Sequence, residues 1–137
     1  MAIKKQSRNS NQIKTTEVAP QVKAFEKPVF SFFNMRNGKY HIDTCSQEQR
    51  SSLALKLSKI GQLSWQDLKT KATKSGLGYE FIDKKAIKGD SVDHLSEDIK
   101  LMAFRFWTQA PMVGYRCSNG AFHILWLDKD FTLYNHG

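Results

Sequence analysis

The sequence predicts an α+β domain in which an N-terminal strand and a helical hairpin pack on a mostly antiparallel sheet that ends in a β-meander. Between residues 47 and 74, apolar residues recur at helical spacing. From residue 79 onward they alternate with polar residues or form short runs bounded by turn residues. This change of period indicates that helices precede most of the strands, so we expect the helices to cover one face of the sheet.

The chain is expected to enter the domain through two short strands. Residues 29–33 form an aromatic and β-branched run that follows a proline, which favours a strand. Asn37-Gly38 then predicts a turn, because this pair tolerates positive φ angles. Residues 39–43 are expected to pair back as a second short strand.

Two helices are expected next, joined by a short connection. Thr44 or Ser46 can cap a helix over residues 47–62, which has glutamate and glutamine in its first turn. Ser64 can cap a second helix over residues 65–74, with an aspartate three positions later. Because so few residues join them, the two helices are expected to form an antiparallel hairpin.

The rest of the sequence predicts mainly strands. Residues 79–83 form a short strand, and residues 84–98 form a polar loop with a helical turn near residues 93–97. The expected meander comprises residues 101–107, 112–117, 121–128 and 131–134.

The net charge of +8 is distributed unevenly along the 137 residues. Residues 1–23 carry five basic residues against Glu17 alone, which is half of the excess. This stretch has few large aliphatic side chains, so it cannot bury enough apolar surface to offset its ordering entropy. We expect residues 1–24 to be a disordered basic arm, which either follows nucleic-acid phosphates or serves as a solubilising tail, and residues 25–137 to be one domain.

Several protein classes do not fit the composition. No stretch reaches about 18 consecutive apolar residues, and the N-terminal residues lack the apolar core of a secretory signal, so we expect a cytoplasmic protein without a membrane partner. Cys45 and Cys117 lie too far apart for a metal knuckle and are too few for a disulfide framework. His41 and His94 are isolated, and we expect neither a metal site nor a cofactor.

The Asn119-Gly120 pair predicts the register of the last hairpin. If these two residues form a two-residue type I′ loop, Arg116 lies directly opposite His123, with Cβ atoms about 4.5–5.5 Å apart. The alternation of side chains then divides the hairpin into two faces. The face expected to pack on the helices carries Val113, Tyr115, Cys117, Phe122, Ile124 and Trp126, and the other carries Gly114, Arg116, His123 and Leu125.

Two cationic side chains placed directly opposite each other would repel, so this pairing requires an explanation. A phosphate bound over Arg116 and His123 would remove their repulsion, and Arg105 on the preceding strand is expected to share that face. Alternatively, His123 is neutral and Arg116 pairs with an acid such as Glu80 or Asp128. Spacing alone leaves both interpretations open.

The C-terminal part resembles a known superfamily. The order of elements, together with Gly114-Tyr115-Arg116, the run from Phe122 to Asp128 and Leu133-Tyr134-Asn135-His136, resembles the RelE/ParE superfamily of bacterial toxins. The resemblance covers residues 26–137. The stretch from residue 111 to residue 136 also resembles small phage- and plasmid-associated proteins.

The resemblance implies a toxin-like, metal-independent endoribonuclease. Such an enzyme needs a base for the 2′-hydroxyl proton, cations for the phosphorane and an acid for the leaving 5′-oxygen. By resemblance, Arg116 matches the strand arginine that holds the phosphate, and Tyr134 and His136 match the groups that transfer protons. Glu80 is the plausible match for a glutamate base.

Further candidates complete the expected site. His123 is an additional base, proposed from the hairpin register and not from the resemblance. Lys84, Lys85 and Lys88 are candidates for auxiliary cations that, with Arg105, grip the RNA backbone. The resemblance implies RNA as the partner, including mRNA on the ribosome, and a cognate antitoxin in a toxin–antitoxin or phage-defence system.

A second hypothesis is a non-catalytic interaction protein of the same fold. It would bind nucleic acid through the basic arm, or a protein such as a topoisomerase or an antitoxin.

Overall fold

The computed structural model describes residues 24–70 and 75–136, and it is an α+β fold with one five-stranded mixed sheet and two helices. The expected arm over residues 1–24 lies outside the described residues, apart from Ala24. The elements in chain order are β1 Val29–Ser31, α1 Gln47–Ile60, α2 Trp65–Thr70, β2 Tyr79–Ile82, β3 Leu101–Trp107, β4 Ala110–Arg116 and β5 Ala121–Leu127, with short 3₁₀ helices η1 Ile42–Thr44 and η3 Lys84–Ala86.

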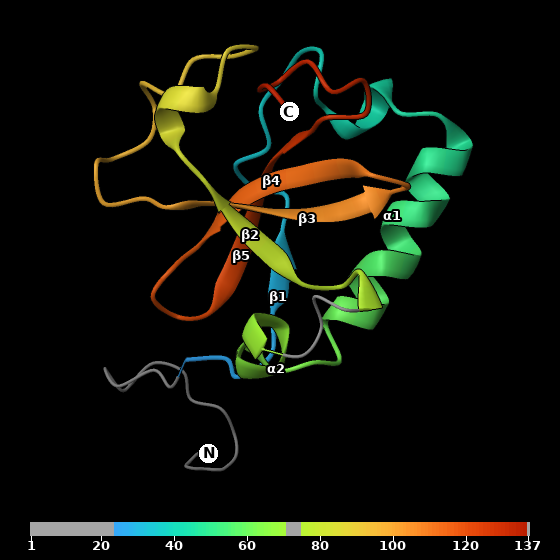
Figure 1. Ribbon diagram of the computed structural model, residues 1–137, viewed down its shortest axis with the longest axis vertical. Coiled ribbons are helices and arrows are strands. Elements are labelled where there is room, and N and C mark those ends of the chain that lie inside the picture. The colour runs from blue at the N-terminus through green and yellow to red at the C-terminus, as the bar shows by residue number, and fades with distance from the viewer. Residues whose placement is uncertain (1–23, 71–74, 137) are drawn as a thin grey trace, which may run out of the picture.

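The sheet has the strand order β1-β5-β4-β3-β2 (Figure 1). Strands β3 to β5 form three strands of the expected antiparallel meander, and β2 extends it at the β3 edge, whereas β1 joins the far edge and runs parallel to β5. The first strand of the domain therefore lies beside its last strand. The C-terminal segment and the loop after β2 lie at the top of Figure 1, α1 at the right and α2 at the bottom.

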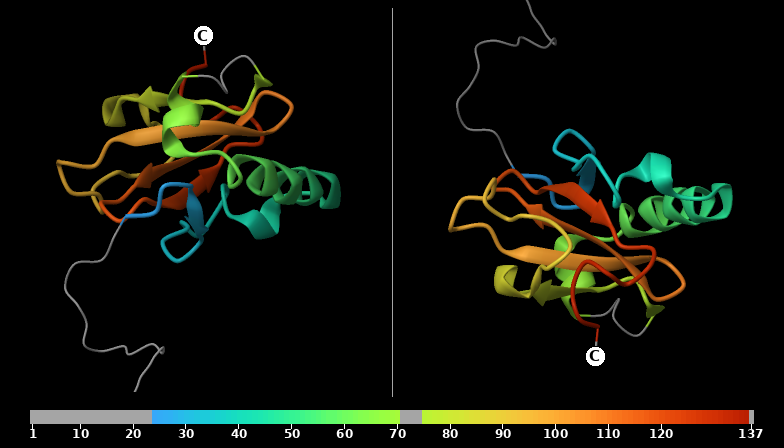
Figure 2. Two further views of the ribbon diagram at one scale, coloured as in Figure 1. Left: turned by 90° about the horizontal axis from the view of Figure 1, so that it is seen from below. Right: turned by 90° about the horizontal axis from the view of Figure 1, so that it is seen from above.

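Both faces of the sheet are buried, which differs from the single core face expected from the sequence. The helix face is the side that α1 and α2 cover. The loop face is the opposite side, which parts of three connecting segments cover (Tyr40, residues 87–99 and residues 133–134). In the left view of Figure 2, α2 lies in front of the sheet, whereas in the right view the loop before β3 and the C-terminal segment lie in front of it and α2 lies behind. Buried strand residues on the helix face are Met102, Phe104, Phe106, Met112, Phe122, Ile124 and Leu127. Those on the loop face are Leu101, Ala103, Val113, Leu125 and Trp126.

The helices begin where side-chain caps predict them to begin. Ser46 accepts a hydrogen bond from the backbone N–H of Gln49, whose side chain accepts in turn from the backbone N–H of Ser46, which is a complete capping box. Ser64 accepts from the backbone N–H of Asp67 at the start of α2. The described part of the second helix ends at Thr70, and residues 71–74 of the expected helix lie outside the described residues.

Two expected strands are wrong. Residues 39–43 form a turn followed by η1, because His41 Nδ1 accepts from the backbone N–H of Asp43 and holds a helical turn. Residues 131–134 do not pair with the sheet, because the backbone N–H groups of Thr132 and Leu133 bind the side chain of Asp128 instead of a neighbouring strand. In the loop after β2, the 3₁₀ helix forms at η3, whereas near residues 93–97 the chain forms a hydrogen-bonded turn in which the backbone N–H of Leu95 donates to Val92 O at 3.0 Å.

Polar contacts fasten the segments on the loop face. The Asp90 carboxylate accepts hydrogen bonds from Arg36 Nε at 3.1 Å and from Trp126 Nε1 at 2.9 Å. Burial opposes the charge of Asp90, but these hydrogen bonds outweigh it and hold the pKa of the carboxyl below its ordinary value. The backbone N–H groups of Lys88 and Gly89 both donate to Leu133 O. Within the described residues no helix is long and apolar enough to cross a membrane.

The turn between β4 and β5 contains three residues and not two. The backbone N–H of Cys117 donates to Ala121 O at 2.9 Å, which makes these two residues the closing pair. Gly120, at a φ of 90°, supplies the left-handed residue that three-residue hairpin loops require. Consequently Arg116 pairs with Phe122, and Tyr115 pairs with His123.

A bulge in the same hairpin changes the faces again further along. Gly114 pairs with Ile124 while Val113 pairs with Trp126, so Leu125 is the extra residue on β5. A Cβ atom on Gly114 would lie 1.9 Å from the backbone oxygen of His123. The close approach of the two strands at this point therefore requires glycine.

We predict that Gly114→Ala destabilises the fold, because the new methyl group meets backbone atoms that cannot move without breaking the β4–β5 ladder. The free energy of unfolding in urea should fall by about 2 kcal/mol or more. Gly61→Ala is the control, since its new Cβ would lie 3.1 Å from its nearest neighbour. An equal loss for both variants would contradict this interpretation of the bulge.

Candidate functional site

The observed register places Arg116 and His123 on opposite faces of the sheet. Residues that pair across strands share a face, and Phe122, the partner of Arg116, belongs to the helix-face core. Tyr115, the partner of His123, packs against the loop-face core. The predicted Arg116–His123 phosphate site is therefore wrong, because one extra residue in the turn reverses the relative facing of the two strands.

Arg116 instead contacts an aromatic ring from α2. Its guanidinium carbon lies 4.5 Å from the centre of the Trp65 ring, and Trp65 Nε1 donates to Gly120 O at 2.9 Å. Neither acid suggested as a partner, Glu80 or Asp128, makes this contact. Arg116 is thus held on the helix face, beside the β4–β5 turn.

His123 lies in a small polar cluster on the loop face. Its ring stacks on Tyr115 with centroids 5.0 Å apart and an angle of 18° between the planes. Asn34 Nδ2 donates to the Tyr115 hydroxyl at 3.0 Å and lies 3.4 Å from His123 Nδ1. This ring nitrogen acts as an acceptor toward Asn34, so the cluster accounts for His123 without a phosphate.

The C-terminal candidates are organised by a carboxylate that the sequence analysis did not place in the site. Asp128 directly follows β5 and its side chain is fully buried. It accepts hydrogen bonds from the backbone N–H groups of Thr132 and Leu133, and it contacts His136 Nε2 at 2.9 Å. Since a buried carboxylate is costly without such partners, these contacts fix the path of the C-terminal segment.

Tyr134 and His136 pack together above this carboxylate. Their rings stack with centroids 4.0 Å apart. Burial, with additional effects from the negative charges of Glu80 and Asp128, raises the pKa of Tyr134 to about 12. The phenol therefore stays protonated at neutral pH and can donate a hydrogen bond but cannot act as a base.

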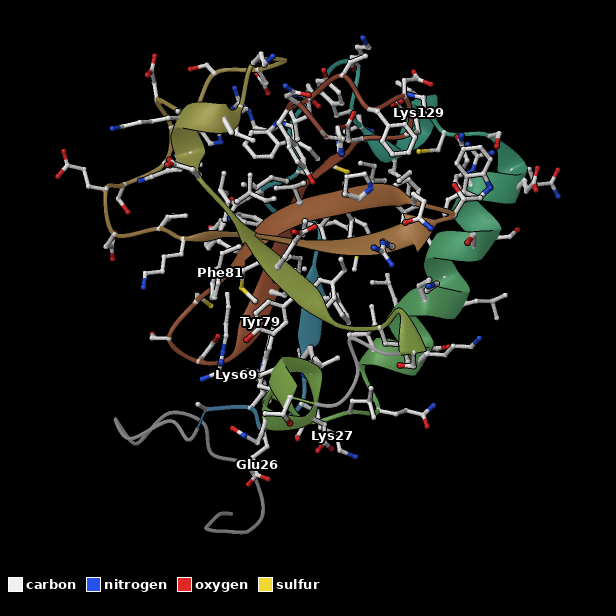
Figure 3. All side chains as sticks on the ribbon, in the orientation of Figure 1. Glu26, Lys27, Lys69, Tyr79, Phe81 and Lys129 are labelled. Atoms are coloured by element: carbon white, nitrogen blue, oxygen red, sulfur yellow. The ribbon has the colours of Figure 1, made fainter. Side chains whose placement is uncertain are left out.

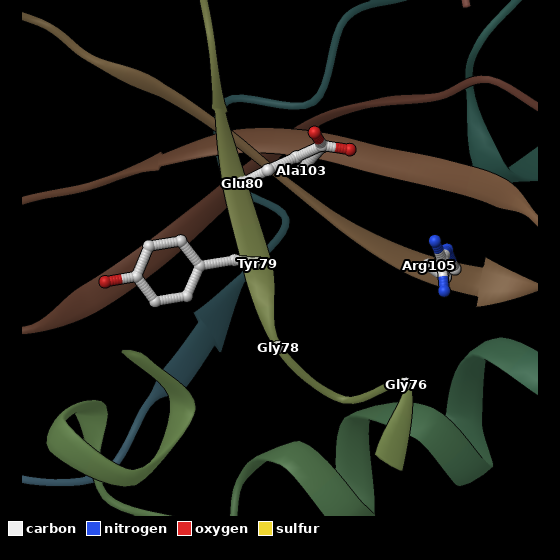
Figure 4. A pocket seen from close by; sticks show the side chains of 6 residues that line it. All are labelled: Gly76, Gly78, Tyr79, Glu80, Ala103 and Arg105. Carbon is white, nitrogen blue, oxygen red and sulfur yellow. The ribbon is translucent and has the colours of Figure 1, made fainter. Parts of the chain in front are cut away.

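Strands β2 and β3 direct an acidic side chain, Glu80, and a basic side chain, Arg105, to the same face of the sheet. Glu80 pairs with Ala103 on β3, and Arg105 is two residues further along the same face. Figure 4 shows the Tyr79 and Glu80 side chains leaving β2 in opposite directions, with Arg105 on the Glu80 side. The side-chain alternation of both strands thus directs a carboxylate and a guanidinium to the loop face.

These groups line one cavity of about 350 Å³ on the loop face, which we name the C-terminal cleft. Its lining residues are Glu80, Ala103, Phe104, Arg105, Gln109, Pro111, Phe131, Tyr134 and His136. A second hollow of about 190 Å³, drawn in Figure 4, adjoins it at Glu80 and Arg105. The structure therefore unites Arg105, Tyr134 and His136 from the predicted set with Glu80, and it excludes Arg116.

The predicted lysines do not line this cleft. Lys84 Nζ donates to the backbone oxygens of Ser96 at 2.9 Å and Glu97 at 3.1 Å, so it closes the loop after β2. Lys85 and Lys88 are exposed on the same loop. A role in RNA binding for Lys85 and Lys88 stays a prediction, whereas Lys84 already has a structural role.

Among residues 24–70 and 75–136, no group of three or more His, Cys, Asp or Glu side chains is arranged to hold a metal ion. Comparison with known proteins gave no match: no protein-family model, no curated protein and no solved structure is similar to this chain.

We predict that Tyr134 makes stability fall at high pH. The unfolded phenol ionises near 10.0 whereas the folded one keeps its proton to a pKa of about 12, so the free energy of unfolding decreases as pH rises from about 10 to 12. Tyr134→Phe should reduce this decrease, measured by urea unfolding at several pH values. Tyr115→Phe is the control, and equal pH slopes for wild type and Tyr134→Phe would refute the prediction.

Proposed function

We propose that this protein is a metal-independent endoribonuclease whose active site is the C-terminal cleft. One observation carries the proposal: the buried Asp128 carboxylate holds His136 at a cavity that also contains Arg105, Glu80 and Tyr134. A carboxylate that orients an imidazole is a recurring arrangement for proton transfer, and a guanidinium beside it supplies the charge that a phosphate needs.

Each side chain has a distinct role in this proposal. Arg105 binds the non-bridging oxygens of the scissile phosphate and stabilises the charge that develops there. Glu80, whose side chain is exposed and lines the cleft, is the base for the 2′-hydroxyl. Tyr134 stays neutral and donates a hydrogen bond to the same phosphate.

His136 is the proposed acid. Because Asp128 engages Nε2, the proton that is exchanged with the substrate is the one on Nδ1. Asp128 does not touch the substrate and is a positioning residue. Its contact with Nε2 is retained before and after proton transfer, so the ring does not have to reorient during the reaction.

The reaction is an internal transesterification. Glu80 takes the proton of the 2′-hydroxyl, and the 2′-oxygen forms a bond to the adjacent phosphorus. The bond from phosphorus to the 5′-oxygen breaks, and this oxygen receives the Nδ1 proton of His136. The products are a 2′,3′-cyclic phosphate and a 5′-hydroxyl, and neither water nor a redox partner is consumed.

The biological class is proposed from the sequence resemblance. Two helices followed by an antiparallel meander is the order of elements that the RelE/ParE resemblance implies, which supports a toxin-like protein. On this proposal the substrate is mRNA, the partner is a cognate antitoxin, and the protein acts in the cytoplasm within a toxin–antitoxin or phage-defence system.

We predict that purified protein cleaves single-stranded RNA and leaves cyclic phosphate ends, with a rate that EDTA does not change. Arg105→Ala and His136→Ala should each reduce the single-turnover rate about a hundredfold or more, because each removes a group acting on the transition state. Arg116→Ala is the matched control, since this arginine lies on the opposite face of the sheet, and it should cleave like the wild type.

An oligonucleotide with one 2′-deoxy position at the cut site should resist cleavage there, because the attacking hydroxyl is missing. Cleavage that survives both Arg105→Ala and His136→Ala in folded protein would refute this active site. If Arg116→Ala were the only one of these variants to lose cleavage, the active site would lie on the helix face and not in the C-terminal cleft.

A second candidate function, nucleic-acid binding without cleavage, is favoured by a groove beside α2. The lining of this groove, of about 710 Å³ on the helix face, includes Trp65, Lys69, Tyr79, Phe81 and Arg116, together with residues 24–26, of which Glu26 is acidic, and residues 64 and 66. Figure 3 shows Phe81, Tyr79 and Lys69 following one another along one side of the molecule. Phe81 is exposed and Tyr79 is partly exposed, whereas Trp65 is buried. Accessible aromatic rings beside cations are suited to stacked bases and phosphates.

The two functions make opposite predictions for two arginines. If the groove binds single-stranded RNA, Arg116→Ala should weaken binding of a short oligonucleotide about fivefold or more and lower its salt dependence, whereas Arg105→Ala should not. Fluorescence anisotropy with a 2′-O-methyl oligonucleotide measures both variants without cleavage. A loss confined to Arg105→Ala would assign binding to the C-terminal cleft and not to the groove.

A further inference from the structure

The turn after β5 contains a residue in an unusual backbone conformation. Phe131 has a φ angle of 60°, in the left-handed region. Glycine and asparagine adopt this region readily, whereas a bulky aromatic residue does so at a cost in free energy. Such a residue persists only where its surroundings determine the backbone.

The surroundings of Phe131 do determine it. Its backbone N–H donates to Asp128 O at 3.3 Å. The next two N–H groups, those of Thr132 and Leu133, donate to the buried Asp128 carboxylate at 2.8 and 3.1 Å. Leu133 is itself fully buried in the loop-face core. The turn is thus fastened on both sides of the strained residue.

This conformation directs the aromatic ring to the C-terminal cleft. Phe131 lines the cavity, yet 41% of its surface is exposed. Its ring meets His136 edge to face, with centroids 5.0 Å apart and 88° between the planes. An exposed aromatic ring therefore stands directly beside the proposed acid and lines the same cavity as Arg105.

We propose that Phe131 is the stacking platform for a nucleobase next to the scissile phosphate, and that it restricts the site to unpaired RNA. This inference rests on the proposed function of the C-terminal cleft. A planar base offers the ring a large stacking surface while the adjacent phosphate reaches Arg105. In a duplex that base is already stacked between its neighbours, so the ring can reach it only in an unpaired segment.

The test measures binding of a non-cleavable 2′-O-methyl oligonucleotide by fluorescence anisotropy. Phe131→Ala should weaken binding about five- to a hundredfold, and Phe131→Trp should restore it. Phe131→Leu keeps an apolar side chain but loses the stacking surface, so it should remain weak. Phe33→Ala is the matched control, because Phe33 is 89% exposed and does not line the cleft.

A second set of oligonucleotides locates the stacked base. Each carries one abasic position, on one or the other side of the cut site. At the stacked position, the abasic change and Phe131→Ala should not add, because they remove the same contact. Additive losses at every position, or wild-type binding by Phe131→Leu, would overturn the stacking proposal. Equal binding of a fully paired duplex would overturn the restriction to unpaired RNA.

The failures of the two proposals are distinguishable. If RNA is cut in an Arg105-dependent manner but Phe131→Ala binds and cuts like the wild type, the stacking proposal fails and the proposed function stands. If no RNA is cut by any preparation, the proposed function fails whatever Phe131 does. Phe131→Gly separates loss of the ring from unfolding, because it removes the ring but relieves the backbone conformation at residue 131. It should melt no lower than Phe131→Ala and still bind weakly, which shows that weak binding is not caused by unfolding.

Discussion

The buried carboxylate of Asp128 is the interaction on which the C-terminal part of the molecule depends. A charge removed from water must be compensated, and here the compensation comes from two backbone N–H groups and one imidazole of the following eight residues. These contacts turn the chain back over the sheet, bury Leu133 and bring His136 to the cleft. One side chain thus closes the loop-face core and positions the proposed active site.

The two faces of the sheet are covered by different kinds of structure. Helices α1 and α2 cover one face, and Leu53, Ile60, Trp65 and Leu68 join its core. Irregular segments cover the other, and their backbone and polar side chains form networks such as the one joining Arg36, Asp90 and Trp126. Glu80 and Arg105 also lie on the loop face, on the neighbouring strands β2 and β3.

Local signals in the sequence predicted the local structure well. Ser46 and Ser64 mark helix starts because capping depends on residues a few positions apart, and the meander follows from alternation within each strand. The Arg116–His123 pair failed because one residue more or less in a turn reverses a face, and Asn119-Gly120 fits loops of two or three residues. The role of Asp128 could not be predicted, since burial by irregular segments leaves no periodic pattern; an acid closing an apolar strand was the one available signal.

The parallel pairing of β1 with β5 has a consequence for how the chain folds. Strands β3 to β5 are joined by short turns and can assemble early, whereas β1 and β5 come from opposite ends of the described chain and meet only after a large loop has closed. During synthesis, β1 leaves the ribosome long before its neighbour exists. Phe30 then lacks its β5 neighbour Phe122 until the last strand emerges, and during this interval an unpaired strand with an apolar side chain is open to wrong contacts.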